Sequence, residues 1–247
     1  MNVKQYLDST YLKTASQAGL SEAENTIVVK NAIAEAIQEG FKLIMIRPEY
    51  VALAKKMIVE ANSVLLVGTV IDFPEGKSSL ESKIKEANEA IANGADDLDF
   101  VCNYEAFKNG DLDLVKQEIL IGTQIGLAND KTVKWIIEVA ALTDKEIIQI
   151  SALIKHVVVS NFKEDDFESV YVKSSTGFYK TDDNVPNGAT VPSIIMMLEN
   201  ASPLSVKAAG GVRSFEEAAE MIRLGVKRIG TSAAKAIANG EISQNQY

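Results

Sequence analysis

Two lysines stand at the ends of predicted β-strands, and their surroundings are alike. Lys173 follows the apolar run of SVYVKSSTGF (169–178), and Lys207 lies in LSVKAAGGVR (204–213). Neighbouring strands lie about 4.8 Å apart, so the two ammonium groups could lie close together. Burial and a like charge both lower the pKa of a lysine, and a partly neutral lysine can attack a carbonyl to form a Schiff base. The pair therefore predicts amine catalysis; the alternative is two unrelated lysines that contact phosphate or solvent.

Further charged residues occupy strand ends, where burial is costly unless a group is paired or functional. Asp99 lies in a largely apolar run, DLDFVC (97–102), which favours a buried position. In TVKWIIEV (132–139), Lys134 and Glu138 share one face, which allows a buried lysine–glutamate pair. The alternative is that Lys134 faces the helices and extends to solvent. Other polar residues at predicted strand ends are Asp8, Arg47, Asp72 and Asn103.

Three segments after the last predicted strands are rich in glycine and small residues. They are SSTG (174–177), AAGGVR (208–213) and GTSAAK (230–235), in which Ser232 adds a hydroxyl. Glycines let backbone N–H groups approach an anion, and the N-terminus of a following helix adds a favourable dipole. Three such segments together predict a phosphate site, although each alone could be only a tight turn.

The elements that would position these residues alternate along the chain. Apolar runs typical of buried parallel strands lie at 41–47, 64–71, 97–102, 132–139, 169–173, 204–208 and 227–231, with a weaker eighth at 6–10. Amphipathic segments predict helices at 22–39, 78–93, 112–128, 143–156, 190–200 and 214–224. This order predicts an α/β fold, a single-domain (β/α)8 TIM barrel over residues 1–247. An open doubly wound sheet is the alternative, but no G-x-G-x-x-G follows the early strands.

Composition excludes several classes of protein. The formal net charge of -9 argues against a nucleic-acid partner, which needs a basic face, but not against a small phosphorylated ligand. The single cysteine, Cys102, cannot form an internal disulfide, which favours the reducing cytoplasm. We find no long apolar segment that would indicate a signal peptide or a membrane span. The single histidine, His156, is interpreted as a structural residue of a helix, and a zinc site of histidine and cysteine is not expected.

These motifs resemble those of the deoxyribose-phosphate aldolase family, class I (Schiff-base) aldolases on a (β/α)8 barrel. The resemblance spans nearly the whole chain and keeps the family order: LDSTYLK (7–13), VIDFPEG (70–76), GADDLDFVCN (94–103), VKWIIEVAALTDKEI (133–147), VKSSTGF (172–178) and VKAAGGVR (206–213). It implies reversible cleavage of 2-deoxy-D-ribose 5-phosphate into D-glyceraldehyde 3-phosphate and acetaldehyde, in deoxyribonucleotide catabolism. It implies no metal or cofactor, and it implies a homo-oligomer, either a dimer or a tetramer.

The resemblance also implies roles for individual residues. Lys173 would form the Schiff base, Lys207 would lower its pKa, and Asp99 would move protons together with an ordered water. Lys134 and Asp8 match positions that support this proton relay. The residues implied in binding the sugar or its phosphate are Thr10, Thr176, Gly177, Gly210, Gly211, Arg213, Gly230 and Ser232.

The C-terminal segment and two departures from the family pattern lead to further expectations. The polar tail from about residue 240 is expected to be flexible, and it ends in Tyr247, which could help to move the enamine proton or have no role. Ala233 stands where many members have a second serine, and Phe178 where some have a phosphate-contacting lysine. Lys180, in the long acidic segment 179–188, could replace that lysine or could simply be exposed.

Two other functions are alternatives at this point. One is a Schiff-base aldolase that acts on a different phosphorylated sugar. The other is a non-catalytic phosphosugar-binding barrel, which would keep the glycine segments but would not need the lysines. The presence of Lys173, Lys207 and Asp99 together favours an enzyme.

Overall fold

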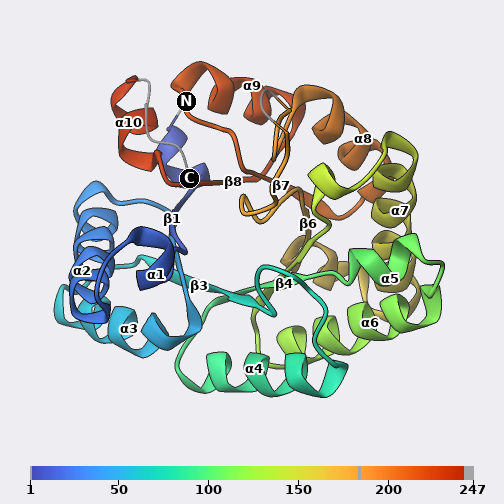
Figure 1. The fold of residues 1–247 in the computed structure, drawn as a ribbon, viewed down its shortest axis with the longest axis horizontal. Helices are drawn as coiled ribbons and strands as arrows, with labels where there is room; N and C mark the ends of the chain where they lie inside the picture. Colours follow the sequence, from blue (N-terminus) through green and yellow to red (C-terminus); the bar gives the residue numbers. More distant parts are fainter. Residues whose placement is uncertain (1, 183–184, 242–247) are drawn as a thin grey trace.

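The computed structural model describes residues 2–182 and 185–241, which include one closed barrel of eight parallel strands. Each strand pairs with the next along the chain, and the last pairs with the first. Figure 1 looks down this barrel and shows the helices around it. The strands are β1 (Leu7–Tyr11), β2 (Leu43–Ile46), β3 (Leu66–Ile71), β4 (Asp97–Val101), β5 (Thr132–Ile136), β6 (Val170–Lys173), β7 (Ser205–Ala209) and β8 (Arg228–Thr231).

Helices follow the strands and cover the outer face of the barrel. They are α1 (Ala15–Ala18), α2 (Glu22–Glu39), α3 (Val51–Glu60), α4 (Leu80–Ala92), α5 (Tyr104–Lys108), α6 (Leu112–Ala128), α7 (Asp144–Asn161), α8 (Val191–Ala201), α9 (Phe215–Leu224) and α10 (Ala234–Asn239). Short 3-10 helices lie at Val3–Tyr6, Pro48–Tyr50, Val139–Ala141 and Glu164–Ser169. Local sequence sets the helix ends: Thr143 and Ser214 form capping boxes, and α9 stops at Gly225.

The barrel confirms the predicted (β/α)8 fold and excludes the open sheet. All eight expected strands form, including the weak one at 6–10, which corresponds to β1. The main difference is at β5, which ends at Ile136 instead of continuing to 139. The cause is Glu138, whose backbone has a φ of 57° and therefore cannot extend the strand. Helices α1, α3, α5 and α10 are additions to the predicted set.

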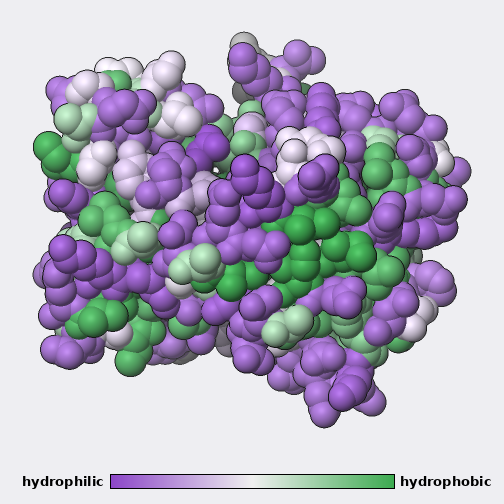
Figure 2. Space-filling model, turned by 90° about the horizontal axis from the view of Figure 1, so that it is seen from below, coloured by the Kyte–Doolittle hydropathy of each residue, from purple (hydrophilic) through white to green (hydrophobic). Residues whose placement is uncertain are grey.

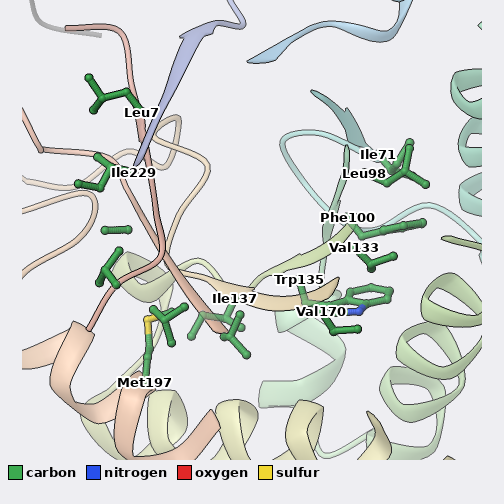
Figure 3. Packing of buried hydrophobic residues seen from close by; sticks show 14 of the residues in the cluster. Leu7, Ile71, Leu98, Phe100, Val133, Trp135, Ile137, Val170, Met197 and Ile229 are labelled. Carbon is green, nitrogen blue, oxygen red and sulfur yellow. The ribbon is translucent and has the colours of Figure 1, made fainter. Parts of the chain in front are cut away.

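The main hydrophobic core lies between the strands and the helices, and the barrel interior holds charged groups beside a smaller apolar cluster. Phe100 of β4 and Trp135 of β5 belong to this core, and their rings stack with centroids 4.9 Å apart (Figure 3). A Cβ at Gly122 of α6 would lie 2.8 Å from Trp135, so the helix packs closely on the sheet. Side chains alternate along a strand, so the neighbours Asp99 and Lys134 lie on the interior side.

Candidate active site

Lys173 and Lys207 lie side by side on β6 and β7. The strand register pairs the two residues directly, and both side chains are buried. Immediately beyond them, the hydroxyl of Ser174 donates to the carbonyl of Ala209 at 2.9 Å and accepts from its N–H at 2.8 Å. This bridge extends the pairing of the two strands past the lysines and so fixes where both side chains begin.

One carboxylate, that of Asp99, joins three lysines in the barrel interior. Its Oδ2 accepts hydrogen bonds from Nζ of Lys173 at 2.8 Å and of Lys207 at 2.9 Å. Its Oδ1 accepts from Nζ of Lys134 at 2.9 Å. Lys207 also forms an ion pair with Asp8 of β1 at 2.6 Å, and all five side chains are buried. The predicted catalytic residues on the described part of the chain therefore form one connected cluster.

Burial and neighbouring charges set the protonation of this cluster. Burial lowers the pKa of Lys173 to about 8; Asp99 opposes the shift and Lys207 adds to it. Burial alone would raise the pKa of Asp99, but the ammonium groups of Lys134, Lys173 and Lys207 hold it well below its usual range. Burial likewise disfavours the charge on Lys134, yet Asp97 and Asp99 raise its pKa to about 12. Lys173 is therefore neutral in about one tenth of the molecules at pH 7, far more than an ordinary lysine, while Asp99 and Lys134 stay charged.

Glu138 does not pair with Lys134, so that interpretation of the 132–139 run is wrong. The left-handed backbone at Glu138 takes it out of the strand alternation on which the pairing depended. The alternative for Lys134 is also wrong, because its Nζ is fully buried between Asp97 and Asp99. Oε2 of Glu138 instead accepts hydrogen bonds from the hydroxyl of Thr176 and, at 3.2 Å, from its N–H. Burial raises the pKa of Glu138 to about 7.

A cavity of about 610 Å³ lies over the ends of β6, β7 and β8. All eight residues predicted to bind the sugar or its phosphate line it: Thr10, Thr176, Gly177, Gly210, Gly211, Arg213, Gly230 and Ser232. Lys173 also lines the cavity, whereas Lys207 and Asp99 are fully buried beneath it. A carbonyl bound in the cavity would therefore meet the amine of Lys173 before any other part of the cluster.

The segment before α8 forms part of the cavity wall. The N–H of Ala189 donates to the carbonyl of Ala209 at 3.1 Å and to that of Gly210 at 2.9 Å. A Cβ at Gly188 would lie 2.5 Å from the carbonyl carbon and oxygen of Gly210, so the two backbones are in contact. The loop that follows β6 is thereby joined to the loop that follows β7.

Three further expectations concern single side chains. Lys180 is exposed, as one of the two expectations for it has it, and it is not among the residues that line the cavity. The ring of Phe178 packs edge-on against Phe73, with centroids 5.1 Å apart. His156 is exposed on α7 and is not a buried structural residue. Tyr247 lies outside the described residues.

Sequence reasoning missed two members of the charged cluster, Asp97 and Arg228. Asp97 forms an ion pair with Lys134 at 2.6 Å. Arg228 of β8 reaches Asp8 at 2.6 Å and Asp97 at 3.2 Å. Each lies two residues before a predicted site residue of its own strand, so strand alternation contained a signal that both point inward.

The fold and the site define a class of protein. A buried amine stands in a cavity wall at the carboxyl ends of the strands, which is where (β/α)8 barrels carry their active sites. The lowered pKa of this amine suits attack on a carbonyl. The class is therefore that of barrel enzymes that use a lysine amine.

Comparison with known proteins places the chain within this class. The family model described as DeoC/LacD family aldolase matches residues 5–243. The deoxyribose-phosphate aldolase of Thermococcus gammatolerans is 36% identical over 97% of this chain and 96% of its own length. That of Streptococcus pneumoniae serotype 19F is 36% identical over 100% of both chains. The chain belongs to the DeoC/LacD aldolase family.

Solved structures agree with this assignment. The structure of QR15, an aldolase, has a TM-score of 0.79 and 30% identity, and the match covers 97% of this chain and 95% of that one. The tetrameric deoxyribose phosphate aldolase from Aeropyrum pernix has a TM-score of 0.75 and 25% identity, with 96% of this chain and 89% of that one covered.

Proposed function

We propose that this protein is a class I aldolase that reversibly cleaves 2-deoxy-D-ribose 5-phosphate into D-glyceraldehyde 3-phosphate and acetaldehyde, a reaction of deoxyribonucleotide catabolism. The observation that carries the proposal is the position of Lys173. Its amine lies in the cavity wall, 2.8 Å from Asp99 and beside Lys207. Full-length relatives named deoxyribose-phosphate aldolase support this choice of substrate.

The reaction begins with the neutral amine of Lys173. It attacks the C1 aldehyde of the open-chain sugar, and the carbinolamine loses water to give a protonated Schiff base. The iminium accepts the electron pair of the C2–C3 bond as that bond breaks and the C3 hydroxyl loses its proton, which releases D-glyceraldehyde 3-phosphate. The remaining enamine takes a proton at C2. Water then hydrolyses the Schiff base, which releases acetaldehyde and restores the amine.

Asp99 is the group placed to move protons in these steps. Its Oδ2 lies 2.8 Å from Nζ of Lys173, the atom that gains and loses protons as the carbinolamine forms and collapses. Lys207 and Lys134 keep this carboxylate charged, and Asp8 holds Lys207 against it. The proposed role of Tyr247 is delivery of a proton to the enamine.

The phosphate is assigned to the loops after β7 and β8. Gly210 and Gly211 have φ angles of 78° and 84°, a left-handed conformation that favours glycine and turns backbone N–H groups toward an anion. Arg213 adds a positive charge at the cavity and Ser232 adds a hydroxyl. The other residues proposed to contact the substrate are Thr10, Thr176, Gly177 and Gly230.

Gly188→Ala is expected to weaken binding of the phosphorylated substrate. The added Cβ would lie 2.5 Å from the backbone of Gly210, so the loop after β7 must shift. We expect KM for 2-deoxy-D-ribose 5-phosphate to rise by roughly tenfold, since small displacements of positioning groups have effects of this size or larger. Unphosphorylated 2-deoxy-D-ribose is the control, and its kcat/KM should change little. An equal loss for both sugars would contradict the assignment of the phosphate to this loop.

The rate should depend on pH through the amine of Lys173. Its pKa is lowered to about 8, and only the neutral form attacks. The value of kcat/KM should therefore rise about tenfold per pH unit below that pKa and level off above it. Initial rates between pH 6 and 9.5 test this expectation. A flat profile over this range would show that the nucleophile is not titrating there.

We also propose that the chain is a single domain, located in the cytoplasm, that assembles into a homo-oligomer, either a dimer or a tetramer. The tetrameric relative from Aeropyrum pernix supports assembly. Figure 2 shows the side of the molecule that lies at the bottom of Figure 1, where apolar residues gather among hydrophilic ones, a feature that subunit interfaces often have. Within the described ranges, no helix is long and apolar enough to cross a membrane.

A direct assay tests the proposed reaction. The purified protein is incubated with 2-deoxy-D-ribose 5-phosphate, and released acetaldehyde is followed by its reduction with alcohol dehydrogenase and NADH. Several other sugar phosphates are run in parallel. Cleavage of 2-deoxy-D-ribose 5-phosphate with the highest kcat/KM is expected. A higher kcat/KM for another sugar phosphate, or binding of all of them without cleavage, would contradict the proposal.

A further inference from the structure

Six charged side chains in the barrel interior form a closed ring of alternating sign. In order around the ring they are Arg228, Asp8, Lys207, Asp99, Lys134 and Asp97. Each member lies between 2.6 and 3.2 Å from the next, and all are buried. Two links cross the barrel: Lys207 of β7 reaches Asp99 of β4, and Arg228 of β8 reaches Asp97 of β4.

The ring is electrically neutral when all its members are charged, because it holds three cations and three carboxylates. Lys173 is a seventh group outside the ring, attached to it through Oδ2 of Asp99 at 2.8 Å. Asp99 already has two cations in the ring, Lys207 and Lys134, each at 2.9 Å. The proton on Lys173 is therefore the one charge of these seven groups that no ring carboxylate balances.

Arg228 is the member that closes the ring. Its Nε donates to Oδ1 of Asp8 at 2.8 Å, and its guanidinium also contacts Asp97 at 3.2 Å. A guanidinium keeps its charge in proteins and spreads it over a planar group, so one side chain can lie against two carboxylates. Without it, Asp8 would keep only Lys207, Asp97 would keep only Lys134, and the ring would carry a net negative charge.

We propose that Arg228 is a positioning residue for the lysine nucleophile: by joining Asp8 to Asp97 it keeps the ring neutral and so leaves Lys173 as the group that releases its proton. This inference rests on the proposed Schiff-base function. Two titratable groups outside the ring also lie near these residues: Glu138 near Lys173, and Tyr171 near Arg228. The ring lysines Lys207 and Lys134 also act on Lys173 and Arg228. None of these closes the ring in place of Arg228, because the link from Asp8 to Asp97 runs through its guanidinium alone among the described residues.

The test compares three variants with the starting protein over pH 6 to 9.5. The acidic limb is the part of the pH profile in which kcat/KM rises with pH as Lys173 loses its proton. Arg228→Met removes the charge and retains the bulk, so this limb should move to higher pH by about half a pH unit to one pH unit. That corresponds to a roughly three- to tenfold loss at pH 6.5 and less than about twofold at pH 9.5. Arg228→Lys restores the charge and should return the limb. Asp97→Asn makes the ring positive and should move the limb in the opposite direction, to lower pH.

Lys83→Met is the matched control. Lys83 is a buried lysine on α4 that pairs with Glu118 at 2.7 Å, outside the ring. Its loss should lower the midpoint of thermal unfolding and leave the acidic limb in place. Equal losses at every pH for Arg228→Met, with the limb unmoved, would assign Arg228 a purely structural role and overturn the proposal. If Arg228→Met does not fold, Asp97→Asn provides the test. An acidic limb of kcat/KM that stays in place in Asp97→Asn would then overturn the proposal.

A second readout separates this inference from the proposed reaction. Competitive labelling with acetic anhydride at several pH values, with peptide mass spectrometry, reports the neutral fraction of Lys173 without any turnover. A labelling midpoint that shifts in opposite directions in Arg228→Met and Asp97→Asn supports the ring even if the protein cleaves a different sugar phosphate. If the labelling midpoint is unshifted in variants of an enzyme that cleaves 2-deoxy-D-ribose 5-phosphate, the proposed role of the ring is wrong and the proposed reaction is unaffected.

Discussion

Lys173→Ala is expected to abolish cleavage of 2-deoxy-D-ribose 5-phosphate, with kcat/KM lower by about 10⁴-fold or more. Alanine has no amine, so neither the carbinolamine nor the Schiff base can form, and only substrate binding remains. The lost side chain also leaves Oδ2 of Asp99 with Lys207 as its cation. That removes the surplus positive charge from the cluster but keeps the ring intact. The fold should therefore survive, and the midpoint of thermal unfolding should change little.

The loss in Lys173→Ala is measured with the acetaldehyde assay at pH 8, using enough enzyme to detect the residual rate. Lys85→Ala is the control, because the side chain of Lys85 is 78% exposed on α4 and lies outside the cavity wall. It should keep full activity. Retention of more than about one hundredth of the activity by a folded Lys173→Ala variant would mean that another group carries the reaction.

Lys207→Leu is expected to lower kcat/KM near pH 7 by about 100-fold. Lys207 shares Oδ2 of Asp99 with Lys173, and its charge helps to lower the pKa of Lys173. Without it, Asp99 pairs more strongly with Lys173, and the pKa of the nucleophile should rise by about one to two units. The neutral fraction at pH 7 would then fall about 10- to 100-fold. Disturbance of the Asp8 contact would add to the loss.

Recovery at alkaline pH distinguishes this effect from simple unfolding. As the pH rises past the new pKa of Lys173, the neutral amine returns, so much of the activity of Lys207→Leu should return as well. A circular dichroism spectrum at each pH verifies that the protein stays folded. If the acidic limb of Lys207→Leu coincides with that of the starting protein, Lys207 does not tune the amine, and its role would be limited to holding Asp99 and Asp8.

Much of the site follows from the sequence because strands and their ends are local features. Lys173 and Lys207 end apolar runs of neighbouring strands, so their proximity follows once the barrel order is known. Asp99 lies in the middle of an apolar run, where a charged group has few reasons to occur. Strand β1 had a weak pattern because most of its residues are polar or charged (LDSTY); Asp8 is buried for its charge partners and not for its hydrophobicity.

The parts of the site that could not be predicted from the sequence depend on contacts between segments that are far apart in the chain. The link from Arg228 to Asp97 joins opposite sides of the barrel, and a pattern read along one strand does not indicate which partner lies across it. The expected pair of Lys134 with Glu138 does not form, because the backbone of Glu138 itself is left-handed and β5 ends before it. The sequence around Glu138 is otherwise typical of a strand, so the pattern did not indicate this end. Instead, Glu138 accepts a hydrogen bond from Thr176, which lies in the loop after β6.

The most direct measurement is a chemical trap of the intermediate. The protein is incubated with acetaldehyde and reduced with sodium borohydride, and its peptides are then mapped by mass spectrometry. Reduction of a Schiff base would leave an ethyl group on the amine, and we expect that group on Lys173 and its loss in Lys173→Ala. An adduct on another lysine, or no adduct in a protein that cleaves 2-deoxy-D-ribose 5-phosphate, would contradict the assignment of Lys173 as the nucleophile.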